Sequence, residues 1–590
     1  MQSVTRFSHF WRFAIIASIC WMVLILCQGP SFDNLSSSLA ALKVQIAHVP
    51  IQGIKPGRFD EVIFQPEDDV SGGAAVNEQL SVSVKGQHDP NQNSLTSQFE
   101  VPESFTNPHG IEISRLWESA KKNQKLILDR QSKSLNQAKS EYQRRYQLPP
   151  PPGFDEWYAY AVKHESPLID EFDDLMESVR PFRKYQESGC QFDHKMDELP
   201  AMLPVCINNQ TIDVGNPGAY DNKQIAIPFK EFTSDFLSAL PDMCFYINTF
   251  DEPRQIIPLE KRNSTRSERD LVCEKHNFTG FKRENIWTQV ITPCEQSTPA
   301  VTASTGNQNI TNYGRLVESW DEATNLCSFG QTPPTGILRC PENFSVTSAA
   351  RPVLSAARLS TFGDILFPTL WRWRFDSKIG EKWAQTEDKT PWEEKINRVG
   401  WRGSSTGGYA LGDNWRQFQR HRMVSLARGM SQPAPYFVNS TQRLQEWLDV
   451  NFTAIVACET EACEAINREL PPVVNQILSD TFKNKIVLDM DGHGLSGRFY
   501  MLLQSGSAVM KQGLVREWHD SRLLPWLHYI PLSMGMAELD DMLQYLFTEG
   551  DHILSSIAAE SQAWTANALR REDMRVYMYR LLIELGRRSF

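Results

Sequence analysis

The chain has 590 residues, a formal net charge of −11, and 41% hydrophobic and 11% aromatic residues. This length is too great for one compact core, so two or three folded units and a tail are expected. The acidic balance argues against a general nucleic-acid binder, which normally presents a basic face.

Near the N-terminus, an uncharged apolar run at residues 13–27 follows Arg6 and Arg12. A cleaved signal peptide has the same order, but small residues at a cleavage site follow its apolar run, whereas this run ends at Cys27 and is followed by Gln-Gly-Pro. Basic residues before the run favour a cytosolic N-terminus and a luminal remainder. We therefore expect a single-pass type II signal anchor, and cleavage of this segment stays an open alternative.

Two further features indicate the secretory pathway. Eight Asn-x-Ser/Thr sequons, the acceptor signal for N-glycosylation, begin at Asn34, Asn209, Asn263, Asn277, Asn309, Asn343, Asn439 and Asn451. Nine cysteines lie beyond the anchor, and the oxidising lumen of this pathway permits disulfides.

The cysteine spacing suggests disulfide pairs without determining them. The candidate pairs are Cys458 with Cys463, which would close a small loop, and Cys273 with Cys294 or Cys327 with Cys340. The odd total leaves one thiol that is free or intermolecular. A zinc site is the competing interpretation, and the absence of any CxxC pair argues against it.

Residues 31–108 are rich in Ser, Asn, Gln, Gly and Pro, which is typical of a stem. From Ile111 to Tyr146, apolar residues recur at near-helical spacing among Lys, Arg and Gln, so one long solvated helix is expected. The helix would end at the four prolines that begin at Pro149, because proline cannot continue a helix.

A second helix is expected around Leu168 to Met176, where apolar residues form a helical stripe. Its carboxylates are Asp170, Glu171, Asp173 and Asp174. They suit a metal site or, as we expect instead, the solvated face of an amphipathic helix.

Short apolar runs alternate with helical patterns in the remainder. Strands are expected at 243–247, 485–488 and 507–511, and helices at 415–427 and 538–547. Such alternation predicts doubly wound parallel sheets, which bind ligands at the carboxyl ends of their strands.

Three strand ends carry residues that suit chemistry. Residues 401–408 read WRGSSTGG, and small residues, hydroxyls and backbone N–H groups there suit a phosphate. Residues 488–500 read LDMDGHGLSGRFY, where Arg498 near a helix start is easiest to explain if it faces an anion. Asp489 and Asp491 resemble a DxD metal motif, but we favour the interpretation that Asp489 ends a strand and Asp491 caps a turn.

The third strand end, residues 246–254, reads YINTFDEPR. A carboxylate at the carboxyl end of a strand is well placed to act as a general base on a hydroxyl group. Asp251 and Glu252 are adjacent, and composition alone does not choose between them.

Taken together, these segments resemble the CAP10-like family of glycosyltransferases, family 90, and their form is similar to its fungal branch. The family includes capsule xylosyltransferases and protein O-glucosyltransferases. The resemblance rests on six segments in order: PPPPGFDEWY from Pro149, NTFDEPR from Asn248, RPVLSAARLSTFGDILFPTLW from Arg351, WRGSSTGG from Trp401, DGHGLSGRFYMLLQSGSAVMKQ from Asp491 and PWLHYIPL from Pro525.

The resemblance implies a GT-B-like α/β fold with two Rossmann-like halves that face a cleft. The expected organisation is a cytosolic tail and signal anchor at 1–30, a stem with a long helix at 31–148, an acceptor-side half at 149–390, and a nucleotide-sugar half with C-terminal helices at 391–590. The C-terminal residues RRSF differ from the KDEL-type signal of many animal relatives. Retention by the anchor, with the Golgi as the address, is therefore expected.

The resemblance also implies roles for individual residues. Asp251 is the implied catalytic base, and Asn248, Asp364 and Trp371 belong to the sugar or acceptor region. The implied donor-diphosphate contacts are Arg402, Gly403, Ser404, Ser496, Gly497 and Arg498. Where animal members have an arginine in an FRG triplet, this chain has Asp491-Gly492.

The expected reaction is inverting transfer of xylose or glucose from a UDP-sugar to a hydroxyl of a glycan or glycoprotein. No cofactor or metal is expected if arginines carry the charge of the diphosphate, and Asp489 and Asp491 leave a Mn or Mg requirement open. The alternatives are a non-catalytic carbohydrate-binding relative and a glycoside hydrolase. A hydrolase needs two carboxylates that flank one bond, whereas adjacent residues on an extended strand point apart. The identity of the sugar and of the acceptor stays open.

Overall fold

The computed structural model describes residues 108–182, 202–215, 220–262, 278–303, 315–369, 390–432, 438–473, 476 and 478–587. These residues belong to one compact unit that spans Glu100–Phe590. The predicted anchor, the stem up to residue 107, and Trp371 lie outside the described residues. Among the helices that are described, none combines the length and apolar character needed to cross a membrane.

One five-stranded sheet is mixed in direction. Its strands are, in spatial order, β2 (Thr211–Val214), β1 (Met202–Asn208), β3 (Met243–Asn248), β6 (Val353–Ser355) and β7 (Ile365–Leu366). β3, β6 and β7 are parallel, but β1 is antiparallel to both β2 and β3. The expectation of purely parallel sheets is therefore wrong here. For β1 and β2, the physical reason is a tight turn at Asn209 and Gln210, both at positive φ, because a hairpin turn forces antiparallel pairing of the two strands that it joins.

The other five-stranded sheet is entirely parallel, as predicted. Its spatial order is β12 (Ile530–Pro531), β11 (Ala508–Gln512), β10 (Asn484–Met490), β8 (Ile396–Ser404) and β9 (Leu448–Ala454). The chain runs outward from β8 to β9 and then returns to β10 on the other side of β8. The strand order therefore reverses between β8 and β10, and ligands bind at such a switch point in doubly wound sheets.

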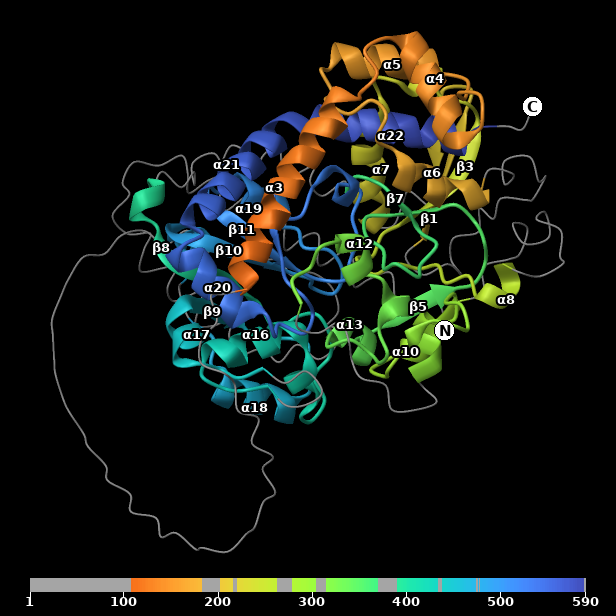
Figure 1. Cartoon of the computed structure of the whole chain (residues 1–590). Coiled ribbons are helices and arrows are strands. Elements are labelled where there is room, and N and C mark those ends of the chain that lie inside the picture. The colour runs from red at the N-terminus through yellow and green to blue at the C-terminus, as the bar shows by residue number, and fades with distance from the viewer. Residues whose placement is uncertain are drawn as a thin grey trace, which may run out of the picture. The chain divides into compact units, whose positions relative to one another are not determined.

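Helices cover both faces of the parallel sheet. α16 (Gln419–Ala427), α17 (Gln442–Trp447) and α18 (Thr460–Glu469) lie on one side, and α19 (Phe499–Gln504) and α21 (Asp551–Ala568) lie on the other (Figure 1). The helix predicted at 538–547 is confirmed as α20 (Leu539–Thr548). The helix predicted from residue 415 begins later, because Phe418 is extended and separates α16 from a 3₁₀ turn at Asn414–Gln417.

The single long helix predicted at 111–146 is two helices, α3 (Pro108–Asp129) and α4 (Leu135–Tyr146). Ser134 is extended between them, and its side chain caps α4 by accepting the Gln137 N–H. The helices are also not solvated on all sides. Ile113 and Tyr142 are buried in hydrophobic clusters, and α3 packs on α20. Their apolar residues therefore belong to the core of the compact unit.

The helix predicted near 168–176 starts only at Asp173, as α6 (Asp173–Val179). Asp170 is buried and accepts the Ser132 N–H at 2.6 Å. Glu171 forms ion pairs with Arg130 and Arg145. These two carboxylates therefore tie down the α3–α4 connection, which corrects the expectation of a solvated face. No metal-binding cluster of three or more such residues occurs in the described part of the chain.

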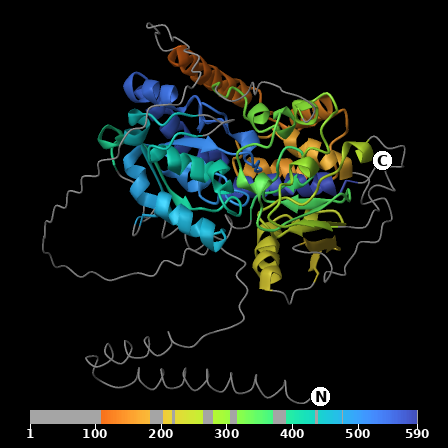
Figure 2. The same ribbon diagram turned by 90° about the horizontal axis from the view of Figure 1, so that it is seen from below.

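Segments from the two ends of the unit lie side by side. α22 (Arg571–Leu585) packs against α5 (Phe154–Lys163), α6 and α7 (Tyr220–Thr233), as Figures 1 and 2 show in dark blue beside orange and yellow. The Trp157 indole donates to the Val576 carbonyl at 3.0 Å. Twelve of the fifteen residues of α22 are buried, so this helix completes the core beside the mixed sheet.

Short elements lie between β3 and β6 in sequence, that is, between two strands of the mixed sheet. They are α8 (Leu259–Arg262), β4 (Phe278–Phe281), α10 (Trp287–Val290), α11 (Pro299–Thr302), α12 (Trp320–Ala323), α13 (Gly336–Arg339) and β5 (Phe344–Thr347). β4 and β5 form a separate antiparallel pair.

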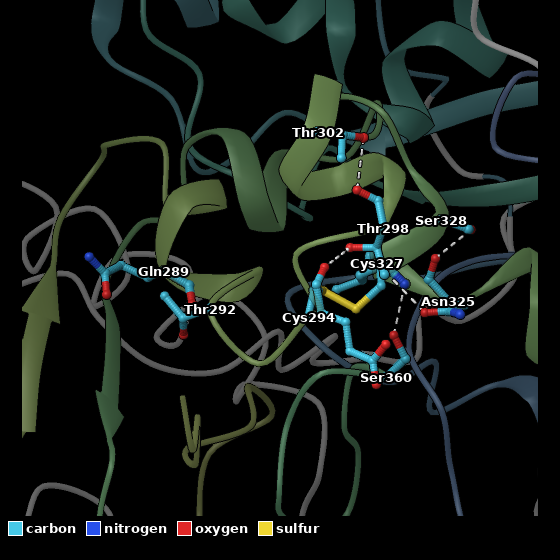
Figure 3. Close-up of a disulfide and its surroundings, with 11 residues drawn as sticks. Gln289, Thr292, Cys294, Thr298, Thr302, Asn325, Cys327, Ser328 and Ser360 are labelled. Atoms are coloured by element: carbon cyan, nitrogen blue, oxygen red, sulfur yellow. Dashed lines mark hydrogen bonds between the residues drawn. A yellow bond between two sulfur atoms is a disulfide. The ribbon is translucent and has the colours of Figure 1, made fainter. Parts of the chain in front are cut away.

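Disulfides hold several of these segments. Among the described residues, the pairs are Cys206–Cys244, which joins β1 to β3, Cys294–Cys327 and Cys458–Cys463, and Cys340 is a buried free thiol. The predicted 458–463 pair is confirmed, whereas the partners predicted for Cys294 and Cys327 are wrong. Figure 3 shows why: Asn325 and Ser360 accept the N–H groups of Cys327 and Leu326, and this turn holds Cys327 beside Cys294.

Candidate functional site

The turn after β3 is shaped by Asn248. Its Nδ2 donates to the Glu252 carbonyl at 2.8 Å, and its Oδ1 accepts the Phe250 N–H at 3.1 Å. Both bonds close the chain around residues 249–251, so Asp251 is exposed at the carboxyl end of β3. Asn248 therefore supports the turn that presents Asp251, a role that its predicted place in the sugar region did not anticipate.

Asp364 holds the chain that leaves this turn. It is completely buried and accepts the backbone N–H groups of Arg254 at 2.9 Å and of Gln255 at 2.8 Å, as well as the Ser355 hydroxyl. Burial raises the pKa of its carboxyl group. The assignment of Asp364 to the sugar or acceptor region stays a prediction, and its hydrogen bonds give both carboxylate oxygens a structural role inside the protein.

Glu252, next to Asp251, is half-buried. Burial, together with the negative charge of Asp251, raises the pKa of Glu252 to about 7. The two carboxylates at this strand end thus have different surroundings, with Asp251 exposed and Glu252 partly withdrawn from water.

This difference predicts a pH dependence of stability. Because the folded-state pKa of Glu252 is about 7 and the usual value is 4.5, the folded protein retains a proton that the unfolded chain releases between these pH values. Stability from this group is therefore fully present below the usual pKa and is lost as the pH rises toward the folded-state pKa. We expect Glu252→Gln to reduce the fall in unfolding free energy between about pH 5 and 7.5 by up to about 2–3 kcal/mol.

Urea unfolding at the two pH values measures this slope. Asp491, whose pKa is also about 7, keeps its own contribution, so the profile of the Glu252→Gln protein should be flatter but not flat. Parallel profiles for the two proteins would contradict the assignment.

The side chain of Arg402, at the end of β8, points toward β9. Nη2 donates to both carboxylate oxygens of Asp449, at 2.8 and 2.9 Å, and Nε donates to Gln476 at 2.6 Å. Nη1 donates to the carbonyls of Trp401 and Asp449. The direct diphosphate contact of Arg402 stays a prediction, and the recorded partners give its guanidinium a structural role in joining β8 to β9.

We expect Asp449→Ala to lower the free energy of unfolding by roughly 3 kcal/mol, because it leaves the charge of Arg402 buried without its ionic partner. The value is placed at the lower end of the usual range because the Asp449 side chain is 29% exposed. Urea denaturation measures it. Asp413→Ala is the control. The Asp413 side chain, which pairs with Arg416, is 78% exposed, so its removal should change the free energy of unfolding by less than about 0.5 kcal/mol. Equal effects of the two substitutions would refute this interpretation.

The structure brings the two donor segments, residues 401–408 and 488–500, together at Gly403. Arg498 donates from Nη1 to the Arg402 carbonyl, and a Cβ atom on Gly403 would lie only 2.8 Å from Arg498 Nη2. The guanidinium of Arg498 thus crosses the end of β8, and glycine leaves the room that it occupies. The Arg-Gly-Ser and Ser-x-Arg segments are therefore in contact, and their roles in donor binding stay predictions.

The hydroxyl and carboxylate side chains near Gly403 form separate hydrogen-bonded groups. Ser496 donates to buried Asp489, whereas Ser404 lies 3.3 Å from the Thr406 hydroxyl. Asp491 accepts the N–H groups of Leu514 and Val515, at 2.6 and 3.1 Å. Burial raises the pKa of Asp489, and it raises that of Asp491 to about 7. Gly497 is exposed with open space beside it.

The hydrogen-bond partners of Asp489 and Asp491 distinguish a DxD metal motif from a strand end and a turn cap. Asp489 is directed to the Ser496 loop, and Asp491 is directed to the segment after β11. The strand-end and turn-cap interpretation therefore describes both carboxylates, and they do not act as one pair in this structure.

The turn after β3 touches the loop after β10. A Cβ atom on Gly494 would lie 2.2 Å from the Asp251 carbonyl oxygen, so the two backbones are in direct contact. A second contact joins Gly336 at the start of α13 to the loop after β8, where its Cβ would lie 2.2 Å from the Gly407 carbonyl. Asp251 and the two donor segments therefore share one region, although they are far apart in sequence.

Sequence reasoning did not identify Gly494 or Arg420 in this region. Arg420 lies on α16 and donates to Ser404, Thr406 and Asp491. The sequence does contain a signal for Arg420. Two arginines, Arg420 and Arg422, lie in a predicted helix directly before the apolar residues of MVSL, which indicate burial.

Residues 338–588 match the family model described as "Glycosyl transferase family 90". Protein O-glucosyltransferase 1 of Rattus norvegicus is 24% identical over 255 residues, which are 40% of this chain and 57% of that protein. The O-glucosyltransferase rumi homolog of Aedes aegypti is 26% identical over 255 residues, 40% of this chain and 56% of that protein. The uncharacterized protein 179R of Invertebrate iridescent virus 6 is 23% identical over 272 residues, 40% of this chain and 23% of that protein.

The chain thus spans a little over half of the two O-glucosyltransferases and less than a quarter of the viral protein. The family match includes the parallel sheet with both donor segments. It begins after Asn248 and Asp251, so the implied base lies outside the matched residues.

Proposed function

Since residues 338–588 match the model of glycosyl transferase family 90, we propose that this protein transfers a sugar from a nucleotide donor to a hydroxyl acceptor. The observation that carries the proposal is the backbone contact between the Asp251 turn and the Gly494 loop. It brings a carboxylate to the switch point of a doubly wound sheet, where nucleotide ligands bind.

In this proposal, Asp251 draws the proton from the acceptor hydroxyl as it attacks the sugar, an effect that typically contributes 10²–10⁴-fold. Arg498 and the backbone N–H groups of residues 406–408 stabilise the negative charge that develops on the leaving diphosphate. Arg402 supports this surface through Asp449. One displacement of this kind inverts the sugar carbon, so an α-linked donor gives a β-linked product.

The proposed donor is a UDP-sugar, UDP-glucose or UDP-xylose, and the proposed acceptor is a glycoprotein or glycan. The names of the two O-glucosyltransferase relatives support glucose and a protein acceptor. The proposed arrangement is GT-B-like, with the mixed sheet on the acceptor side and the parallel sheet on the donor side. The proposed place of action is the Golgi lumen, and three disulfides among the described residues support an oxidising compartment of the secretory pathway.

Nucleotide release by the purified full chain tests the proposal. The chain would be incubated with UDP-glucose, UDP-xylose and other nucleotide sugars, each with a protein acceptor extract, and each with Mn²⁺, with Mg²⁺ and with a chelator. Turnover of one donor that depends on the acceptor is the expected result. Donor binding without turnover under all conditions would favour the non-catalytic carbohydrate-binding alternative. Absence of both would refute the proposal.

A further inference from the structure

Arg420 is a charged residue in the interior of the protein. It lies on α16 and is 5% exposed, in a helix whose first eight residues are all buried. A buried guanidinium is unfavourable unless its N–H groups are satisfied. The partners of Arg420 therefore indicate why an arginine is present here.

The recorded acceptors come from two separate loops. On the loop after β8, Nη1 donates to the Ser404 carbonyl at 3.0 Å and to the Thr406 hydroxyl. On the end of β10, Nε donates to the Asp491 carbonyl at 2.9 Å and Nη2 to the Met490 carbonyl at 3.2 Å. One side chain thus joins both segments that flank the switch point.

The pairing of β8 with β10 does not extend to these two loops. The recorded pairing of β8 with β10 ends at Gly400 with Val487, several residues before Ser404 and Asp491. Beyond that pair, the planar guanidinium of Arg420 provides a cross-link of fixed geometry. Gly492 accommodates it closely, since a Cβ atom there would lie 3.2 Å from Nη2.

We propose that Arg420 is a positioning residue that sets the spacing between the loop at 404–408 and the loop at 490–498, and thereby the fit of both to a nucleoside diphosphate. The proposal rests on the proposed function, because it treats these loops as the donor site. The ring of Trp401 supports the geometry, with Arg420 Cζ at 5.5 Å and Arg498 Cζ at 5.7 Å from its centroid. A shift of Arg420 would therefore move the surroundings of Arg498.

Arg422 provides a matched control on the same helix. It is 2% exposed, and it donates to the carbonyls of Met534 at 2.8 Å and Gly535 at 3.1 Å. The chemistry is the same as that of Arg420, but these acceptors follow β12. Loss of Arg422 should therefore affect stability without a specific effect on the two loops.

The experiment compares Arg420→Lys and Arg422→Lys in the full chain, with UDP as the probe. Lysine keeps the charge but loses the planar fork, so both variants should show a lower Tm. We expect Arg420→Lys to weaken UDP binding at least tenfold, to raise the donor KM more than the acceptor KM, and to speed amide hydrogen exchange in both loops. Arg422→Lys should change the Kd for UDP less than twofold. Equal effects of the two variants on UDP binding would overturn the proposal.

Thr406→Val gives an independent test if Arg420→Lys does not fold. It removes one acceptor of Arg420 and preserves shape, so amide exchange should rise in residues 490–494 of the unliganded protein, on the opposite loop. Unchanged exchange there would overturn the cross-link. If the wild-type chain binds no UDP or other nucleoside diphosphate, the proposed function fails, whereas this exchange comparison still tests the role of Arg420.

Discussion

Asp251→Asn is expected to lower the rate of sugar transfer by about 10²–10⁴-fold and to leave UDP binding and Tm near their wild-type values. Asparagine has almost the same shape as aspartate, but its amide does not accept the proton of the acceptor hydroxyl. Asp251 is exposed on a turn that Asn248 closes through the backbone of residues 250 and 252. The substitution should therefore change the chemical step and not the fold.

Glu252→Gln is the matched control, because it neutralises the neighbouring carboxylate on the same turn. We expect it to reduce transfer by less than about tenfold, since Glu252 is turned partly into the protein and its pKa is raised to about 7. Initial rates at saturating donor and acceptor compare the two variants. The reverse ranking, with Glu252→Gln inactive and Asp251→Asn active, would transfer the role of base to Glu252.

Gly403→Ala is expected to weaken UDP binding by about 10–100-fold, the range that corresponds to loss of one hydrogen bond to a charged group. The added Cβ atom would lie 2.5 Å from the Trp401 ring and 2.8 Å from Arg498 Nη2. Trp401 is 2% exposed and has little freedom to move. The methyl group should therefore displace the guanidinium of Arg498 from the end of β8.

Isothermal titration with UDP measures this effect. Gly280→Ala is the control for a glycine-to-alanine change within a strand, because no atom lies within 4 Å of the Cβ position at Gly280. Arg498→Ala should weaken binding to a similar extent, and the double substitution should add little, because both act on the same guanidinium. Wild-type affinity in Gly403→Ala would show that Arg498 does not contribute to donor binding.

Strand ends could be predicted because the relevant signals are local. An apolar run followed by a glycine or a polar turn marked β3, β8 and β10, and the chemistry-bearing residues follow directly on these runs. The hydrophobic periodicity also identified most of α20. These features depend on neighbours within a few residues, and a sequence displays such neighbours directly.

Side-chain partners could not be predicted, because they lie far away in the sequence. Arg402 follows the expected strand, yet its guanidinium is directed by Asp449 on β9, 47 residues later. Asp364 binds the backbone N–H of Arg254, 110 residues away. The break between α3 and α4 depends in the same way on Asp170. In each case the sequence indicated that the polar residue is important, but its hydrogen-bond partner becomes adjacent only in the folded chain.

The position of α22 has a consequence for the biosynthesis of the protein. The helices that it covers, α5 to α7, are synthesised early, and α22 itself begins only at Arg571. At about 5–20 residues per second, α22 follows α5 from the ribosome after about 20–80 s. During this interval, the apolar surface that later receives residues such as Val576 and Leu582 has no native cover. A nascent chain of this kind depends on chaperones until its last helix is made, and early termination before residue 571 should yield a product that aggregates.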